Sequence, residues 1–179
     1  MVCNVCVFLA NTTFHTISRA VFCTSDLNPH PSVHQYTLNF PASHSEILSQ
    51  FREQLRAAKR VDASTTSLPE HNVVVLFDSI NSMPGIMMPW KEMVKICKEE
   101  GAWSIVDAAH SLGQELDIDL SAVDPDFWIS VSYTPSPRLS PWYCILFFLT
   151  DKYSYHRTAT NGYTPNADVQ FFTCPSGVC

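Results

Sequence analysis

The stretch that most constrains the fold of this chain runs from Gly101 to Ser130. It contains two short apolar runs, Trp103–Val106 and Phe127–Ser130, which are too short for helices and have the composition of buried strands. Asp107 follows the first run directly, and in open α/β sheets ligands bind beyond the carboxyl ends of the strands. We therefore expect Asp107 to face a ligand. His110, three residues later, is expected to reach the same ligand from the following turn.

Asp107 begins a longer motif. The chain reads Asp-Ala-Ala-His-Ser-x-Gly from residue 107, Asp-Leu from residue 119 and Asp-Pro-Asp-Phe-Trp-x-Ser from residue 124. This string resembles the cofactor-binding half of the class V aminotransferases, which are fold-type I enzymes that use pyridoxal 5′-phosphate (PLP). It is most similar to their isopenicillin N epimerase-like branch. The resemblance runs from about residue 12 to residue 130 and is strongest from Phe77 onward.

The resemblance implies roles for two residues. PLP acts as an electron sink while its pyridine nitrogen stays protonated, and an adjacent anion holds that proton in place. Asp107 matches the family's partner of the pyridinium, and His110 matches the position that donates to the phenolic oxygen of the ring. Taken singly, Asp107 could instead cap the next turn, and His110 could be an ordinary hydrogen-bonded loop histidine. The intact enzyme is expected to be a homodimer that acts on an amino acid by aminotransfer, epimerisation or C–S lysis.

Hydrophobic patterns upstream of the motif predict further α/β elements. Ser43 and Glu46 have the spacing of a capping box, and apolar residues follow at helical spacing, which predicts a helix near 45–59 with one buried face. A polar loop at 61–71 is expected next. The continuous apolar run Val73–Phe77 is then typical of a strand covered on both faces.

A second helix is predicted near 89–100, because Pro89 favours the first turn of a helix and Gly101 favours a left-handed cap at its end. The order helix, strand, helix, strand, strand predicts a partial parallel α/β sheet. The resemblance assigns this sheet to the large domain of a fold-type I PLP enzyme. Residues 12–22 could form a further helix, and Thr37–Phe40 alternates like a strand.

The chain divides into three parts by these patterns. Residues 1–36 form a poorly defined N-terminal segment, residues 37–130 are the partial large domain, and residues 131–179 form an irregular tail. Within the second part, the loop Asp78–Gly85 lies where this fold gathers its active-site loops. Two interpretations of that loop stay open, a ligand contact and a turn shaped by Pro84 and Gly85.

The sequence after Ser130 departs from the family pattern. In the family a His-Lys pair follows the last strand within a few residues, and its lysine binds PLP covalently and moves the substrate's α-proton. Here Thr134 holds the ordinal place of that lysine, and the next lysine along the chain is Lys152, in an unrelated setting. The chain is therefore expected to be an enzyme fragment without PLP-dependent activity. The alternative is a non-catalytic α/β module that binds a ligand or partner at the same strand ends.

A retained intron would explain this departure. Val131-Ser132 can be encoded GTA-AGT, a splice donor, Leu149-Thr150 can supply a branch point, and His156-Arg157 can supply the closing acceptor. The enclosed length, codons 131–156 and two further bases, is not divisible by three. Residues 157–173 read one base later can encode Asn-Cys-His-Lys-Trp-Leu-Tyr-x-Lys-Arg-Gly-Cys-Ala-Val-(Leu or Phe)-Tyr-Val, which would join the missing lysine segment directly to Ser130.

Composition excludes several other classes of protein. A net charge of −6 without a basic cluster argues against nucleic-acid binding. The seven cysteines are scattered, so we expect free thiols in a reducing, cytoplasmic compartment, and Cys3-x-x-Cys6 lacks the second ligand pair of a zinc site. The apolar run at 142–149 is too short to span a bilayer, which needs about 20 residues. We therefore expect no metal and no membrane partner.

Overall fold

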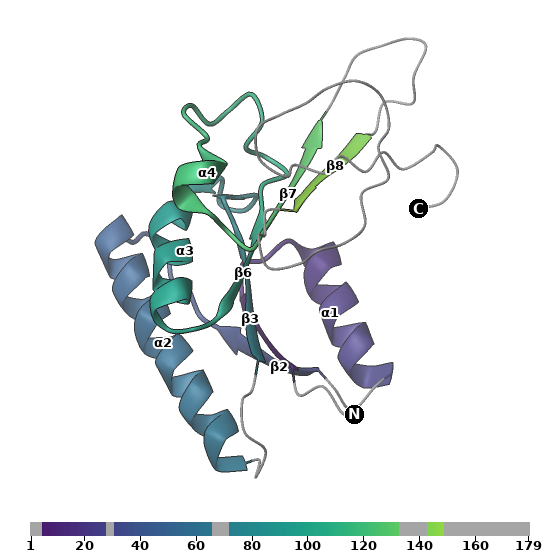
Figure 1. The fold of residues 1–179 in the computed structure, drawn as a ribbon, viewed down its shortest axis with the longest axis vertical. Coiled ribbons are helices and arrows are strands. Elements are labelled where there is room, and N and C mark those ends of the chain that lie inside the picture. Colours follow the sequence, from purple (N-terminus) through teal and green to yellow (C-terminus); the bar gives the residue numbers. More distant parts are fainter. Residues whose placement is uncertain (1–4, 28–30, 66–71, 133–142, 149–179) are drawn as a thin grey trace.

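The chain folds into a six-stranded sheet with helices on both faces (Figure 1). The computed structural model describes residues 5–27, 31–65, 72–132 and 143–148. The sheet strands, in the spatial order β2-β1-β3-β6-β7-β8, are β1 (Val5–Ala10), β2 (Ser32–Tyr36), β3 (Asn72–Asp78), β6 (Trp103–Asp107), β7 (Phe127–Ser132) and β8 (Tyr143–Phe148). The other elements are α1 (His15–Leu27), α2 (His44–Thr65), α3 (Trp90–Glu99), α4 (Leu120–Val123) and a small antiparallel pair, β4 (Ile80–Asn81) and β5 (Ile86–Met87).

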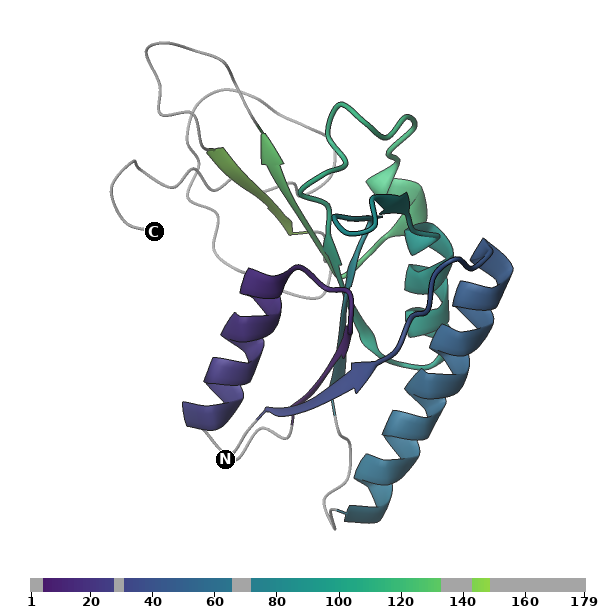
Figure 2. The same cartoon turned by 180° about the vertical axis from the view of Figure 1, so that it is seen from behind.

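The two faces of the sheet are covered unequally. Helices α2 and α3 lie on one face and α1 lies on the other, as the two opposite views show (Figures 1 and 2). The core lies on the α2 and α3 side, where Phe51 and Met93 pack with inward residues of the strands such as Phe77 and Val106. In contrast, α1 buries none of its side chains. Most of the hydrophobic stabilisation of the described fold therefore comes from one face.

The predicted parallel sheet is confirmed. Strands β1, β2, β3, β6 and β7 pair in parallel throughout, and β3 and β6 align so that Asp78 lies beside Asp107. The predicted helices near 45–59 and 89–100 correspond to α2 and α3. Helix α2 continues to Thr65, so the loop expected from residue 61 begins later than predicted.

The predicted helix signals are confirmed by hydrogen bonds and backbone angles. The backbone N–H of Ser43 donates to Glu46 Oε2 at 2.7 Å, and the Glu46 N–H donates back to Ser43 Oγ at 3.3 Å, which is a capping box. Pro89 is the residue before the first turn of α3. Gly101 follows that helix with a φ of 65°, the left-handed conformation that glycine adopts without steric cost.

The predicted strand at Thr37–Phe40 is wrong. The strand is β2, which ends at Tyr36, one residue before the predicted segment. Side chains, rather than a neighbouring strand, bind the backbone of Thr37 and Leu38. The Leu38 N–H donates to Asn11 Oδ1 at 2.8 Å, and Gln54 bonds both the N–H and the C=O of Thr37. The alternation arises because Leu38 is buried in the core, not because the segment joins the sheet.

Three strands of the sheet lie in the parts where none was expected. Strands β1 and β2 belong to the N-terminal segment, and the apolar run within the predicted irregular tail contains β8, which pairs antiparallel with β7. The rest of that tail, residues 133–142 and 149–179, lies outside the described residues, as does Lys152. No helix within the described segments has the length and apolarity needed to cross a bilayer.

Candidate functional site

Two carboxylates end neighbouring strands at the carboxyl edge of the sheet. Asp78 is the last residue of β3 and Asp107 is the last residue of β6, and the two are paired in register. Paired residues of adjacent parallel strands point to the same face of a sheet. Because Phe77 and Val106 belong to the core under α2 and α3, the alternation directs both carboxylates toward the opposite face. The Asp78 residue is only 7% exposed, whereas Asp107 is partly exposed.

Burial makes both acids weaker, and like charge adds to this effect at Asp78. Burial, and then the charge of Asp107, raise the pKa of Asp78 to about 7. Burial also raises the pKa of Asp107, but the hydrogen bond from Ala109 and the charge of His110 oppose that increase. Asp78 Oδ1 is a buried atom without a hydrogen-bond partner. The edge therefore concentrates acid groups that a cationic or N–H-bearing ligand would stabilise.

Serine side chains fix the backbone around these carboxylates. The backbone N–H of Ser79 donates to the Asp107 carbonyl at 2.8 Å, and the Ser79 hydroxyl contacts the hydroxyl of Ser111. Ser130 Oγ donates to the Ala108 carbonyl at 2.7 Å. All three serines are fully buried. We call Asp78, Asp107, Ser79, Ser111 and Ser130 the carboxyl-edge cluster.

His110 lies in the turn that follows Asp107, and its side chain is exposed. Its charge lowers the pKa of Asp107, so the two predicted site residues lie close enough to interact. Asp107 Oδ1 also accepts a hydrogen bond from the Ala109 N–H at 3.0 Å. The simpler interpretation of Asp107, that it caps the next turn, is thus present in the structure. It leaves the other carboxylate oxygen available for a ligand.

The loop after His110 is held against the start of α3. Trp90 Nε1 donates to Glu115 Oε1 at 2.6 Å, and Lys91 Nζ donates to the Asp117 carbonyl at 3.0 Å. Trp90 is 1% exposed, so this hydrogen bond ties the loop to the core. The sequence patterns predict the helix that contains Trp90 but do not indicate that Trp90 bonds to the loop.

The described residues fit one end of PLP. The pair of carboxylates, one with an unpartnered buried oxygen, suits a protonated ring nitrogen. The lysines of the described part of the chain lie elsewhere: Lys59 contacts the Glu100 carbonyl, Lys98 pairs with Asp124 at 2.6 Å, and Lys95 is exposed on α3. The same residues include no group of three or more side chains placed to hold a metal ion.

Sequence reasoning missed Asp78 as a site residue. For the loop that begins at Asp78, the sequence allows a turn and a ligand contact equally. The available signal was positional, since an acid directly after the apolar run Val73–Phe77 matches Asp107 after its own run. The register of β3 against β6 places the two acids side by side. This register cannot be deduced from the two apolar runs alone.

Comparisons with known proteins identify the family. Residues 30–132 match the model of the aminotransferase class-V family. The chain is 40% identical over 95 residues to an L-cysteine desulfhydrase of Arabidopsis thaliana, which covers 52% of this chain and 19% of the relative. It is 28% identical over 124 residues to the L-cysteine desulfhydrase-like protein lolT1 of Epichloe uncinata, covering 69% of this chain and 25% of that protein. The chain thus spans about a fifth to a quarter of the length of these relatives.

Solved structures share the fold. A structure titled as a SepCysS–SepCysE N-terminal domain complex matches with a TM-score of 0.58 at 18% identity, over 83% of this chain and 36% of that one. Sphingomonas wittichii serine palmitoyltransferase matches with a TM-score of 0.53 at 19% identity, over 80% of this chain and 32% of that one. The predicted resemblance is confirmed at the level of the family, while the isopenicillin N epimerase-like branch stays a prediction. With more than half of its residues matched by the family model, the chain belongs to the aminotransferase class-V family.

Proposed function

We propose that this chain is part of the cofactor-binding half of a PLP-dependent enzyme that cleaves a C–S bond in an amino acid. The observation that carries the proposal is the Asp107 carboxylate at the carboxyl end of β6, beside Asp78, in a family whose enzymes depend on PLP. The reaction class is favoured by the relatives, which include L-cysteine desulfhydrases and a hercynylcysteine sulfoxide lyase of Schizosaccharomyces pombe. Aminotransfer and epimerisation are the other reactions that the family resemblance allows.

When bound, PLP supplies an electron sink for the bond that breaks. On this proposal Asp107 holds the proton on the ring nitrogen by its negative charge, and His110 donates to the phenolic oxygen. The hydrogen bonds from Ser79 and Ser130 support those roles, because they fix the backbone carbonyls of Asp107 and Ala108. On the same proposal an amino acid would be the substrate, and a homodimer in the cytoplasm would be the working form.

The chain as written lacks the catalytic lysine in this proposal. The described lysines have other contacts or lie on an exposed helical face, and Lys152 is not in a family setting. We therefore expect no desulfhydrase activity from this chain. The measurement is H₂S release from L-cysteine with added PLP, together with the absorbance of the mixture before and after borohydride. A borohydride-reducible species on Lys152, or sustained turnover, would contradict this expectation.

The missing lysine is explained by a retained intron after Ser130. This part of the proposal rests on the donor, branch-point and acceptor codons and on the lysine segment encoded in the shifted frame. Strand β8 lies inside the proposed intron, and its apolar run is compatible with that origin. An unpaired sheet edge accepts a further strand of any chain with a suitable apolar pattern. Genomic and transcript sequencing decide the question: all mature message retaining codons 131–156, or DNA without GT at codon 131, would exclude the intron.

The alternative function is a non-catalytic ligand-binding module. The observation that favours it is that the carboxyl-edge cluster is assembled although the chain has no lysine at the family's position. Titration with 4-deoxypyridoxine 5′-phosphate, which cannot react with a lysine, separates the two ideas when combined with the transcript. Binding that weakens in Asp107→Asn, with a spliced lysine-bearing message, supports the enzyme. Binding with unspliced message throughout supports the module, and absence of binding contradicts the assignment of the cofactor site to this chain.

A further inference from the structure

Asp78 is the strongest unexplained feature of the carboxyl-edge cluster. It is the most buried carboxylate there, and one of its oxygens has no partner. The family resemblance assigned roles to Asp107 and His110 but none to Asp78. A buried acid without a partner is costly, so its presence beside the proposed cofactor residue calls for a physical account.

The geometry requires the two acids to titrate together. They end adjacent strands at paired positions, and adjacent strands lie about 4.8 Å apart. At paired positions on one face of the sheet the two carboxylates repel each other when both are ionised, which favours a state that retains one proton. Within the described residues no Arg or Lys forms an ion pair with either of them.

The surroundings decide which acid keeps the proton. Asp107 is partly exposed, accepts the Ala109 N–H at 3.0 Å, and lies near His110, and all three features favour its charged form. Asp78 is nearly inaccessible to solvent and lacks a partner on Oδ1, which favours its neutral form. Two other titratable groups interact electrostatically with the pair, Tyr36 from β2 with Asp78 and His110 from the turn with Asp107. The charge of Asp78 is one of the causes that raise the pKa of Tyr36.

We propose that Asp78 is a positioning residue of the cofactor site, which shares one proton with Asp107 and keeps it as the neutral member of the pair. Asp107 is then the charged member, the state that a protonated ring nitrogen needs. This role rests on the proposed function, but the sharing of the proton is a property of the free chain. The different surroundings of Asp78 and Asp107 thus give two identical side chains different protonation states.

The test is carboxyl-carbon NMR of the whole chain labelled with ¹³C-aspartate, titrated between about pH 4 and pH 9 without cofactor. Asp78 should titrate near pH 7, and the resonance of each acid should report the titration of the other. In Asp107→Asn the titration of Asp78 should move down by about one pH unit, because the neighbouring charge is gone. In Asp78→Asn the main titration of Asp107 should stay in place, because its neighbour is already neutral when Asp107 ionises, but the Asp107 resonance should lose the second step near pH 7 that reports Asp78. That loss provides a second reading if the first variant does not fold.

Asp117→Asn is the matched control. Asp117 is exposed and has a φ of 59°, a conformation that asparagine also tolerates, so this variant should leave both titrations unchanged. An Asp78 titration that does not move in Asp107→Asn, or an Asp107 resonance that shows no second step when Asp78 titrates, would overturn the proposal. Failure of 4-deoxypyridoxine 5′-phosphate to bind would instead contradict the proposed function, while coupled titration in the free chain would still support the shared proton.

Discussion

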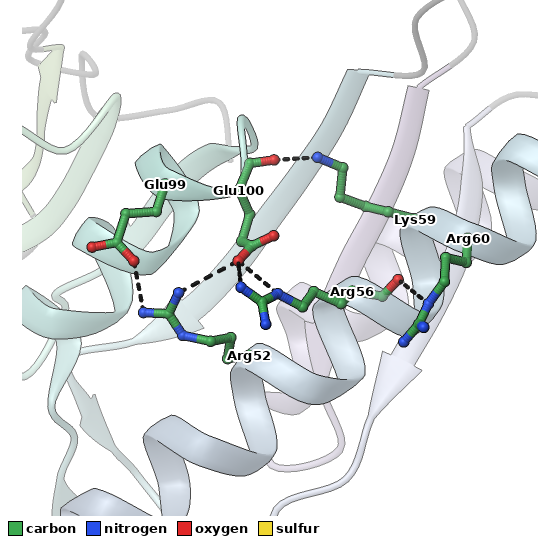
Figure 3. A network of polar contacts seen from close by, with 6 residues as sticks. All are labelled: Arg52, Arg56, Lys59, Arg60, Glu99 and Glu100. Atoms are coloured by element: carbon green, nitrogen blue, oxygen red, sulfur yellow. Dashed lines mark hydrogen bonds and ion pairs between the residues drawn. The ribbon is translucent and has the colours of Figure 1, made fainter.

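Two polar clusters on this fold use acidic residues in opposite ways. In the carboxyl-edge cluster, Asp78 and Asp107 lie side by side and neither pairs with a described Arg or Lys. Between α2 and α3, Arg56 Nη2 lies 2.7 Å from Glu100 Oε1 and Arg52 Nη2 lies 2.7 Å from Glu99 Oε2 (Figure 3). We call Arg52, Arg56, Glu99 and Glu100 the helix ion-pair cluster.

The pKa values of the acids separate the two clusters. Hydrogen bonding to Arg56 is the main cause that lowers the pKa of Glu100, whereas burial raises the pKa of Asp78. The helix ion-pair cluster borders an open groove of about 620 Å³, but its acids are already satisfied by basic partners. Groove volume alone therefore points to a region other than the proposed cofactor site. Acids left without basic partners, at the carboxyl ends of strands, are the better guide to function.

The largest effect is expected from Asp107→Ala in a spliced, lysine-bearing version of the protein. Loss of the charge beside the ring nitrogen should abolish turnover, a decrease in kcat of at least about 10²–10³-fold, while PLP can still be bound covalently. The measurement is kcat for L-cysteine together with the absorbance spectrum of the bound cofactor. Glu100→Ala, from the helix ion-pair cluster, is the control and should retain kcat. Full activity in Asp107→Ala would remove the functional distinction between the clusters.

The next effect is on stability, measured in the chain as it stands. The folded-state pKa of Asp78 is raised, so its contribution is fully present below the unfolded pKa near 4 and is lost as the pH rises through about 7. The free energy of unfolding should therefore decrease between pH 4 and pH 8, by up to about 4 kcal/mol from this residue alone. In Asp78→Asn that decrease should be much smaller. Urea unfolding at several pH values tests it, and an unchanged slope in the variant would contradict the shift.

Of the two acids in the carboxyl-edge cluster, the sequence predicts Asp107 but not Asp78. Asp107 could be predicted because a strand run and a turn motif fix its place along the chain. The position of Asp78 beside Asp107 depends on the register of β3 against β6, which local sequence patterns do not determine. The contact between Ser79 and Ser111 depends in the same way on the path of two loops. Thr37–Phe40 was misassigned because burial of Leu38 imitates strand alternation, while Asn11 and Gln54 supply its backbone partners from distant segments.

The smallest effect is expected from Glu100→Gln in the helix ion-pair cluster. The folded-state pKa of Glu100 is lowered, so its contribution is present above the unfolded pKa and is lost as the pH falls through the folded value. Glu100→Gln should therefore destabilise the chain by less than about 1 kcal/mol at pH 7, since surface ion pairs are weak and screened. The loss should shrink at pH 3 and in 1 M salt, where the Debye length falls to about 3 Å. Urea unfolding of Glu100→Gln beside Asp78→Asn should give effects of opposite pH dependence. If both variants followed the same pH trend, the two clusters would not differ in the way that their hydrogen bonds and burial indicate.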